Sequence, residues 1–492
     1  MQEKYDSSDF ESVLGYIANR FGSKEVFSNQ VRCVSLVYDL APQLDSERKT
    51  LSELFECGFV GSMVEVIESD DETKLVTFYD GQENFINQSG MDRNWCINIT
   101  NTLARILQWP TATGIIDKLM DDAKKLQEES QFDLAYEKYC LAGKMGCVEA
   151  KVQSCKLVLD GNVEIKDSGI VKTLKEAALA NSGLAQYLLF VLHNSGNMVA
   201  KDERQAMYYL KKSAKNGVPE AQYEYAFELM RGNSVEQDRN LAEDYFRRAV
   251  EQGYKVAYGG LGLLYELTGR EESAKESYRQ GAEAGYFYCM RKYAEMLLQS
   301  SATSDRKKAF DLLTRASKDR TPETLYLLGV CHENGYGCNI NIEEARALYR
   351  EAAEADIPEA QYAYGRICMK NDEEEIREHG VQLMLAAAKN DNEAAIEIAC
   401  SYLFENMEGN EKLLHSMLEK GRRYKIPVAF RYSGILYCRG LSVDKDTAKG
   451  LDYLRRAFAE GDTDSQQFLN EFSVEQKEEK PKGFFKKLFK NK

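Results

Sequence analysis

The chain has 492 residues, of which 29% are charged and 43% are hydrophobic, and its formal net charge is −15. This length is too great for one core, and the balance of charged and apolar residues excludes an intrinsically disordered chain. Because an acidic surface repels phosphate backbones, we expect no nucleic-acid partner.

The 12 cysteines are scattered singly, without any C-x-x-C pair. This distribution predicts small buried hydrophobes in a reducing compartment and argues against a disulfide framework. No run of roughly 18 apolar residues occurs, so no membrane-spanning segment is predicted. The polar, acidic N-terminus does not resemble a secretory signal, and we expect a cytoplasmic protein.

Residues 1–112 are predicted to form a small, mostly helical module. Apolar residues recur there at helical spacing, for example at Leu14, Ile17 and Phe21. The run Leu-Val-Thr-Phe-Tyr at 75–79 is instead compatible with a β-strand. The module follows no repeat and resembles no family that the sequence identifies.

This module carries no catalytic constellation. The first histidine of the chain is His193, and no phosphate-binding loop occurs. The cysteines Cys33, Cys57 and Cys96 have no activating neighbour in the sequence. We therefore expect no enzyme, no metal and no cofactor. An alternative stays open, in which the module is catalytic or handles a nucleotide and the rest of the chain is its targeting subunit.

From residue 113 to residue 472 the sequence repeats itself. A small residue opens each unit, and successive openings are 32 to 36 residues apart. The opening residues are Ala150, Ala185, Ala221, Ala257, Cys289, Thr324, Ala360, Ala394, Ala429 and Ser465. A period of this length, kept over most of a chain, predicts an array of about ten helix-pair repeats.

The pattern inside a unit explains the period. In the unit that opens at Thr324, the first helix ends in a turn at Gly335, where glycine permits a left-handed backbone. The second helix then carries Ala345, Tyr349 and Ala352 on one face. Such a pair cannot bury its apolar face alone. Stacking of pairs therefore predicts an α-solenoid with an extended concave surface.

This alternation of glycine, alanine and tyrosine resembles the Sel1-like repeats, which are relatives of the tetratricopeptide repeat. The resemblance implies an all-α, right-handed α-solenoid that serves as a non-enzymatic scaffold for protein–protein interaction. Two units depart from the pattern. The unit from Ala257 has lost its turn, and the unit from Ala394 has Leu414 and Leu418 where tyrosine and alanine are expected. Residues 464–472 are predicted to form a single capping helix.

The concave groove is the expected binding site for a partner protein or peptide. The exposed polar positions of the first helices would line it. The predicted groove residues are Gln186, Gln222, Glu224, Arg291, Tyr326, Gln361 and Arg431.

Residues 473–492 are predicted to form a linker and a basic amphipathic tail. If the tail is helical, one face is apolar and the other carries lysines. The tail residues concerned are Phe484, Phe485, Lys486, Lys487, Leu488, Phe489 and Lys490. The stretch 478–489 resembles the membrane-targeting tail of the bacterial Min-system division ATPase, which implies contact of these seven residues with an anionic membrane on its cytoplasmic face. A fully soluble adaptor, whose tail is itself a peptide ligand, is the alternative.

Overall fold

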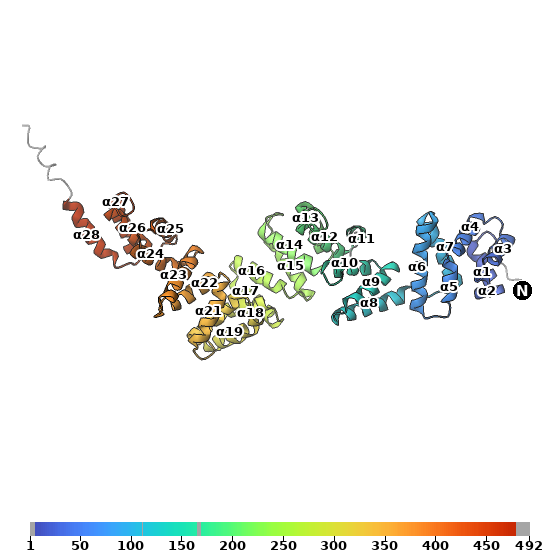
Figure 1. Cartoon of the computed structure of the whole chain (residues 1–492), viewed down its shortest axis with the longest axis horizontal. Coiled ribbons are helices and arrows are strands. Elements are labelled where there is room, and N and C mark those ends of the chain that lie inside the picture. The colour runs from blue at the N-terminus through green and yellow to red at the C-terminus, as the bar shows by residue number, and fades with distance from the viewer. Residues whose placement is uncertain (1–4, 111, 165–168, 479–492) are drawn as a thin grey trace, which may run out of the picture. The chain divides into compact units, whose positions relative to one another are not determined.

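The computed structural model describes residues 5–110, 112–164 and 169–478. Regular structure in these residues is helical throughout, so the predicted all-α class is confirmed. The chain divides into two compact units, residues 1–254 (unit 1) and 255–492 (unit 2). In each unit successive helices lie side by side as hairpins (Figure 1), which is the arrangement of an α-solenoid.

The first seven helices precede the repeats. They are α1 (Phe10–Phe21), α2 (Ser23–Phe27), α3 (Gln30–Leu40), α4 (Asp45–Glu56), α5 (Phe59–Glu65), α6 (Asp71–Ser89) and α7 (Arg93–Ile106). The suggested strand at 75–79 is wrong, because these residues lie inside α6. The side chain of Asp70 accepts a hydrogen bond from the Thr73 amide at 3.0 Å and so begins the helix. Leu75, Phe78 and Phe85 then share its buried face.

The remaining helices of unit 1 form the first repeats. They are α8 (Ala112–Glu128), α9 (Phe132–Lys144), α10 (Val148–Leu159), α11 (Ile170–Leu179), α12 (Gly183–Ser195), α13 (Glu203–Lys215), α14 (Pro219–Arg231) and α15 (Arg239–Glu251). One cluster of buried residues runs from Phe10 in α1 to Val163 beyond α10. The core of the N-terminal helices is therefore continuous with that of the first repeats and has no break near residue 112.

Unit 2 continues the pattern of helix pairs. Its helices are α16 (Ala257–Leu267), α17 (Glu271–Glu283), α18 (Phe287–Leu298), α19 (Thr303–Ala316), the 3-10 helix η1 (Ser317–Asp319), α20 (Pro322–Asn334), α21 (Ile342–Glu354), α22 (Pro358–Cys368), α23 (Glu374–Lys389), α24 (Glu393–Glu405), α25 (Glu411–Arg423), α26 (Pro427–Arg439), α27 (Thr447–Ala459) and α28 (Ser465–Glu478). The helix predicted at 464–472 thus extends to Glu478 as α28.

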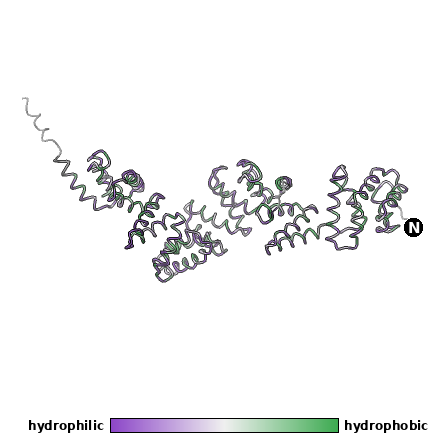
Figure 2. Tube along the Cα trace, in the orientation of Figure 1, coloured by the Kyte–Doolittle hydropathy of each residue, from purple (hydrophilic) through white to green (hydrophobic). Residues whose placement is uncertain are grey.

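Each helix pair consists of a first helix, A, and a second helix, B, packed through small residues. Hydrophobic and hydrophilic positions alternate along the helices (Figure 2), as burial of one face requires. At Gly329 of α20 an added Cβ atom would lie 2.6 Å from a ring carbon of buried Tyr349 in α21. Glycine therefore lets helix A approach the aromatic ring of helix B.

The predicted opening residue Ala394 is wrong by one position. Ala394 in α24 is exposed, whereas Ala395 is fully buried and occupies the third helical position, as Ala221 does in α14. The buried leucines Leu414 and Leu418 of α25 take the expected places of tyrosine and alanine. Because this unit lacks the usual tyrosine and alanine, the sequence pattern places its opening residue one position too early.

A recurring turn joins helices A and B in four pairs, α12–α13, α14–α15, α20–α21 and α26–α27. Helix A ends at a glycine with positive φ, for example Gly232 at 75°. The residue that caps helix B then donates its backbone N–H to a carbonyl near the end of helix A. In α14–α15, Asp238 donates to Leu229 at 3.0 Å and its side chain accepts from Leu241. The pair α16–α17 lacks this turn, as its shorter spacing predicts.

Candidate interaction surface

Three of the predicted groove residues are buried and were wrongly expected to be exposed. Gln186, Gln222 and Gln361 are only 1%, 3% and 3% exposed. The Gln222 amide nitrogen donates to the carbonyl of Ala214 in the preceding B helix at 3.4 Å. Its oxygen accepts from Gln252 at the end of its own B helix, at 2.8 Å. The glutamine thus joins neighbouring repeats.

Gln186 repeats this arrangement one unit earlier. Its amide nitrogen donates to the Ala178 carbonyl at 3.2 Å, and its oxygen accepts from Asn216 at 2.8 Å. Gln361 in unit 2 donates to the Asp356 carboxylate at 3.0 Å. Because buried amides need hydrogen-bond partners, Gln186 and Gln222 serve the packing of the repeats, whereas the buried Oε1 atom of Gln361 has no partner among the residues that the structure describes.

Arg431 is held at the end of its own repeat. Its guanidinium pairs with Asp462 at 2.5 Å and with Asp464 at 2.8 Å, and its side chain is 13% exposed. It also lies over the ring of Tyr432, 5.2 Å from the centroid. A partner would have to break this ion pair to reach Arg431.

The other three predicted residues are half-buried. Arg291 of α18 lies 5.2 Å from the centroid of the Tyr288 ring. Tyr326 of α20 lies beside Tyr349, with ring centroids 5.8 Å apart. Burial, followed by the nearby carboxylates of Glu359 and Glu333, raises the pKa of Tyr326. Arg291 and Tyr326 in unit 2 and Glu224 in unit 1 are therefore partly exposed.

Ion pairs lie close to Tyr326 and Arg291. Arg366 forms an ion pair with Glu333, which also accepts a hydrogen bond from the Tyr349 hydroxyl at 2.8 Å. Lys292, next to Arg291, pairs with Glu266 at 3.2 Å and with Glu295 at 3.4 Å. Several of the charges next to Tyr326 and Arg291 are therefore paired with one another.

The A helices α12 and α14 of unit 1 present a different surface, on which aromatic and acidic side chains gather. We call it the aromatic–acidic surface, and it consists of Tyr187, Phe190, Glu220, Tyr223, Glu224, Phe227 and Glu228. All seven are half-buried. Ring centroids are 5.9 Å apart for Tyr187 and Phe190, and 4.9 Å apart for Tyr223 and Phe227. Of these seven residues only Glu224 is among the predicted groove residues, because the sequence does not tell whether the aromatic residues face the core or the solvent.

The carboxylates of this surface are not neutralised. No ion pair of the described residues involves Glu220, Glu224 or Glu228, and the Oε2 atom of Glu228 is buried without a hydrogen-bond partner. Burial and the Glu228 carboxylate raise the pKa of Glu224, although Arg231 acts in the opposite direction. Burial and Glu224 also raise the pKa of Tyr187 to about 12. The surface therefore favours a cationic ligand.

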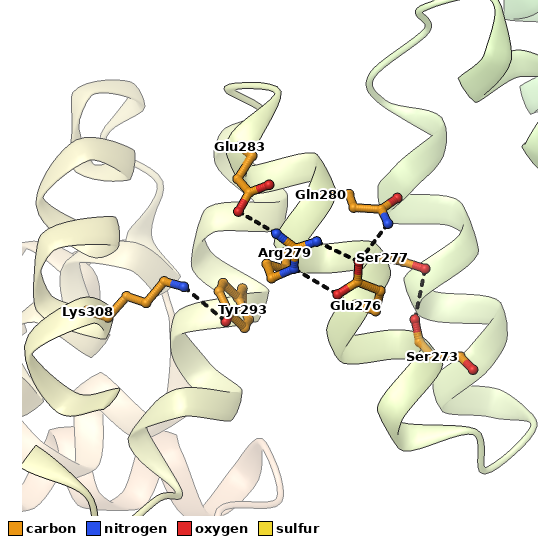
Figure 3. Close-up of polar contacts among 8 residues, drawn as sticks. All are labelled: Ser273, Glu276, Ser277, Arg279, Gln280, Glu283, Tyr293 and Lys308. Carbon is orange, nitrogen blue, oxygen red and sulfur yellow. Dashed lines mark hydrogen bonds and ion pairs between the residues drawn. The ribbon is translucent and has the colours of Figure 1, made fainter. Parts of the chain in front are cut away.

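The B helices carry ordinary surface networks. On α17, Arg279 donates to Glu276 at 2.6 Å and to Glu283 at 2.5 Å, and Gln280 donates to Glu276 at 2.7 Å (Figure 3). The hydrogen bonds from Arg279 lower the pKa of Glu276 to about 2. All these residues lie within two turns of one helix, as surface ion pairs of helices commonly do.

A cleft of about 540 Å³ lies between the N-terminal helices and the first repeats. Tyr79, Arg93, Tyr136 and Lys151 are among its lining residues. Arg93 pairs with Glu83, which also lines the cleft. No sequence pattern predicts this cleft, because it forms only where the N-terminal helices pack on α9 to α11.

The described residues contain no set of three His, Cys, Asp or Glu side chains that could hold a metal ion. Burial raises the pKa of Cys33 to about 12 and does the same for Cys289 and Cys400, which makes these thiols poor nucleophiles. None of the described helices has the length and apolar character needed to cross a bilayer. The predicted tail residues 484–490 lie outside the described residues.

Comparison with known proteins places these features in context. Five segments match the family model of the Sel1 repeat, at residues 183–218, 219–254, 287–319, 322–357 and 427–462. The first two lie in unit 1 and the others in unit 2. The unmatched stretch between them contains α16–α17, the pair without the recurring turn.

Two relatives are similar in sequence. An uncharacterised protein of Neisseria meningitidis is 28% identical over 289 residues, which are 51% of this chain and 61% of that protein. The chitin synthase regulator SKT5 of Saccharomyces cerevisiae is 27% identical over 203 residues, which are 40% of this chain and 25% of the regulator. The chain thus spans less than two thirds of the length of the curated relatives it matches.

A solved structure is similar in fold. The crystal structure of a protective antigen of uropathogenic Escherichia coli, which displays an SLR fold, superimposes with a TM-score of 0.57 at 20% identity. The match covers 73% of this chain and 83% of the antigen. Segments that match the Sel1 repeat therefore lie in both units of the chain, within an all-α solenoid of helix pairs.

Proposed function

We propose that this protein is a non-enzymatic scaffold that binds other proteins through the A helices of its repeats. The aromatic–acidic surface of unit 1 carries the proposal. Its rings are partly exposed and its carboxylates form no ion pair with any described residue, whereas the buried amides of Gln186 and Gln222 are hydrogen-bonded between repeats. Half-exposed aromatic residues are typical anchors of protein interfaces.

The proposed contacts of unit 2 are Arg291 and Tyr326. Both are half-buried on A helices, and both lie next to another aromatic ring. Since several of the surrounding charges are paired, this surface suits a polar partner segment that exchanges hydrogen bonds with it. The similarity to a yeast regulator of chitin synthase supports a role in binding other proteins.

Site-specific photo-crosslinking tests the scaffold function. A photoreactive phenylalanine analogue replaces Tyr187 in unit 1 or Tyr326 in unit 2, in the cells that make the protein. Tyr208 on helix B of unit 1, which is 51% exposed, is the matched control. We expect adducts of defined mass from the two A-helix positions and none from Tyr208. Equal labelling at all three positions would refute a partner site on the A helices.

We further propose that residues 484–490 recruit the cytoplasmic protein to the inner face of the membrane. The amino-acid composition of this segment supports the proposal, because lysines interleaved with phenylalanines suit an anionic bilayer. Each lysine contributes at most about 1 kcal/mol near such a surface, so binding is expected to be weak and reversible. Co-sedimentation with anionic and neutral vesicles tests this. The intact chain should pellet with anionic vesicles only, and a chain with Phe484, Phe485 and Phe489 changed to serine should not.

A further inference from the structure

One segment of the chain has a composition that is complementary to the aromatic–acidic surface. Although the whole chain has a net charge of −15, residues 480–492 contain six lysines and no acidic residue. Three phenylalanines, Phe484, Phe485 and Phe489, lie between these lysines. No other segment of the chain combines this charge with this aromatic content.

The aromatic–acidic surface carries unpaired negative charge, which is complementary to this composition. Three carboxylates, Glu220, Glu224 and Glu228, form no ion pair in the described part of the chain. The buried Oε2 atom of Glu228 has no donor, which leaves the desolvation of that oxygen uncompensated. A lysine ammonium group placed there would supply both a hydrogen bond and a charge.

The aromatic rings of the surface are also complementary to the phenylalanines and lysines of residues 480–492. Tyr223 and Phe227 pack on buried Phe246 at centroid distances of 5.8 and 5.2 Å, so their inner faces are fixed. Both stay partly exposed on the outside, as do Tyr187 and Phe190. Rigid, partly exposed rings are suited to stacking with phenylalanine and to contact with lysine.

We propose that residues 480–490 of a second copy of the chain bind to the aromatic–acidic surface of unit 1. The lysines would face the carboxylates, and the phenylalanines would pack on the exposed rings. This inference goes beyond the scaffold and membrane proposals. It makes the tail a ligand that a partner of unit 1 displaces, and it couples occupation of this surface to release of the tail toward lipid.

Fluorescence anisotropy with a labelled peptide of residues 479–492 tests the proposal. The receptor is the full-length chain whose own tail carries Phe484→Ser, Phe485→Ser and Phe489→Ser. We expect saturable binding that weakens with salt. The variant Glu220→Gln/Glu224→Gln/Glu228→Gln should bind about tenfold more weakly.

A matched control separates the surface from the net charge. The variant Glu203→Gln/Glu236→Gln/Glu251→Gln removes the same charge at exposed positions of unit 1 and should bind as the parent does. Circular dichroism checks that both triple variants fold. As a second measurement, the chain with its natural tail should bind the labelled peptide more weakly than the tail variant, because the tails of other copies compete.

Three results would overturn the proposal: no saturable binding, equal weakening in both triple variants, or equal binding by chains with and without the natural tail. Binding of the peptide to anionic vesicles but not to the protein would assign the tail to the membrane alone. Failure here would leave the photo-crosslinks at Tyr187 unaffected, so it is distinguishable from failure of the scaffold function.

Discussion

Replacement of Gly262 by alanine tests whether close packing of helices A and B holds a repeat together. A Cβ atom at Gly262 in α16 would lie 2.3 Å from Cε1 and 2.5 Å from Cζ of Tyr278 in α17. The Tyr278 ring is fully buried, and its hydroxyl donates to Glu266 at 3.0 Å. The ring cannot turn away without losing this bond, so the two helices must separate.

The expected cost follows from two opposing effects. Alanine favours a helix over glycine by about 1 kcal/mol, whereas overpacking a tight core costs about 1 to 3 kcal/mol. Since two ring atoms are overlapped, we take the upper end and expect a net loss of about 2 kcal/mol. This loss corresponds to an equilibrium constant for opening of the α16–α17 pair that is about 30-fold larger.

Hydrogen exchange followed by mass spectrometry measures this opening helix by helix, which a single melting temperature cannot do for a repeat array. Gly15→Ala in α1 is the control, because nothing lies within 4 Å of its added Cβ atom and its backbone is helical. We expect slower exchange in α1 for the control and faster exchange in α16 and α17 for Gly262→Ala. Unchanged exchange in α16 and α17 would refute the packing argument.

Three further predictions concern hydrogen bonds and charge. Gln222→Ala should cost about 1 to 3 kcal/mol in urea denaturation, and much less when Gln252 is already alanine, because the two amides share a bond. The depressed pKa of Glu276 means that its pairing with Arg279 stabilises the fold above pH 4.5 and is lost as the pH falls toward 2. Because these groups are exposed, Glu276→Gln should cost less than about 1 kcal/mol at pH 7 and nothing near pH 2. Burial raises the pKa of Glu224, so its charged form destabilises the folded protein. Glu224→Gln should therefore stabilise the protein slightly at pH 7 but not below pH 4.5.

The repeat was predictable because its signal is redundant. Small residues such as Ala221 and Ala360 recur at one period, and each is fully buried at the third position of an A helix. A single unit with unusual residues, as at Ala394, was enough to shift the assignment by one position. At 75–79 the strand prediction relied on local propensity, although the cap at Asp70 already signalled a helix.

The binding surface was harder to predict than the fold. Gln186 and Gln222 were chosen because they are polar, yet they occupy the same position in neighbouring repeats, and such recurrence indicates packing. That recurrence is the signal that would have excluded them. Tyr187 and Phe190 were overlooked because the sequence does not tell whether an aromatic residue of a repeat faces the core or the solvent.

The core that runs without a break from α1 to α10 has a consequence for assembly. An array of helix pairs ends in an apolar face at each terminus, and such faces tend to stack on one another. In unit 1 the helices before α8 cover that face and pack against it through contacts such as Lys138 with Glu72 at 2.6 Å. The N-terminal helices thus bury the apolar face on which the first repeats of another copy would otherwise stack.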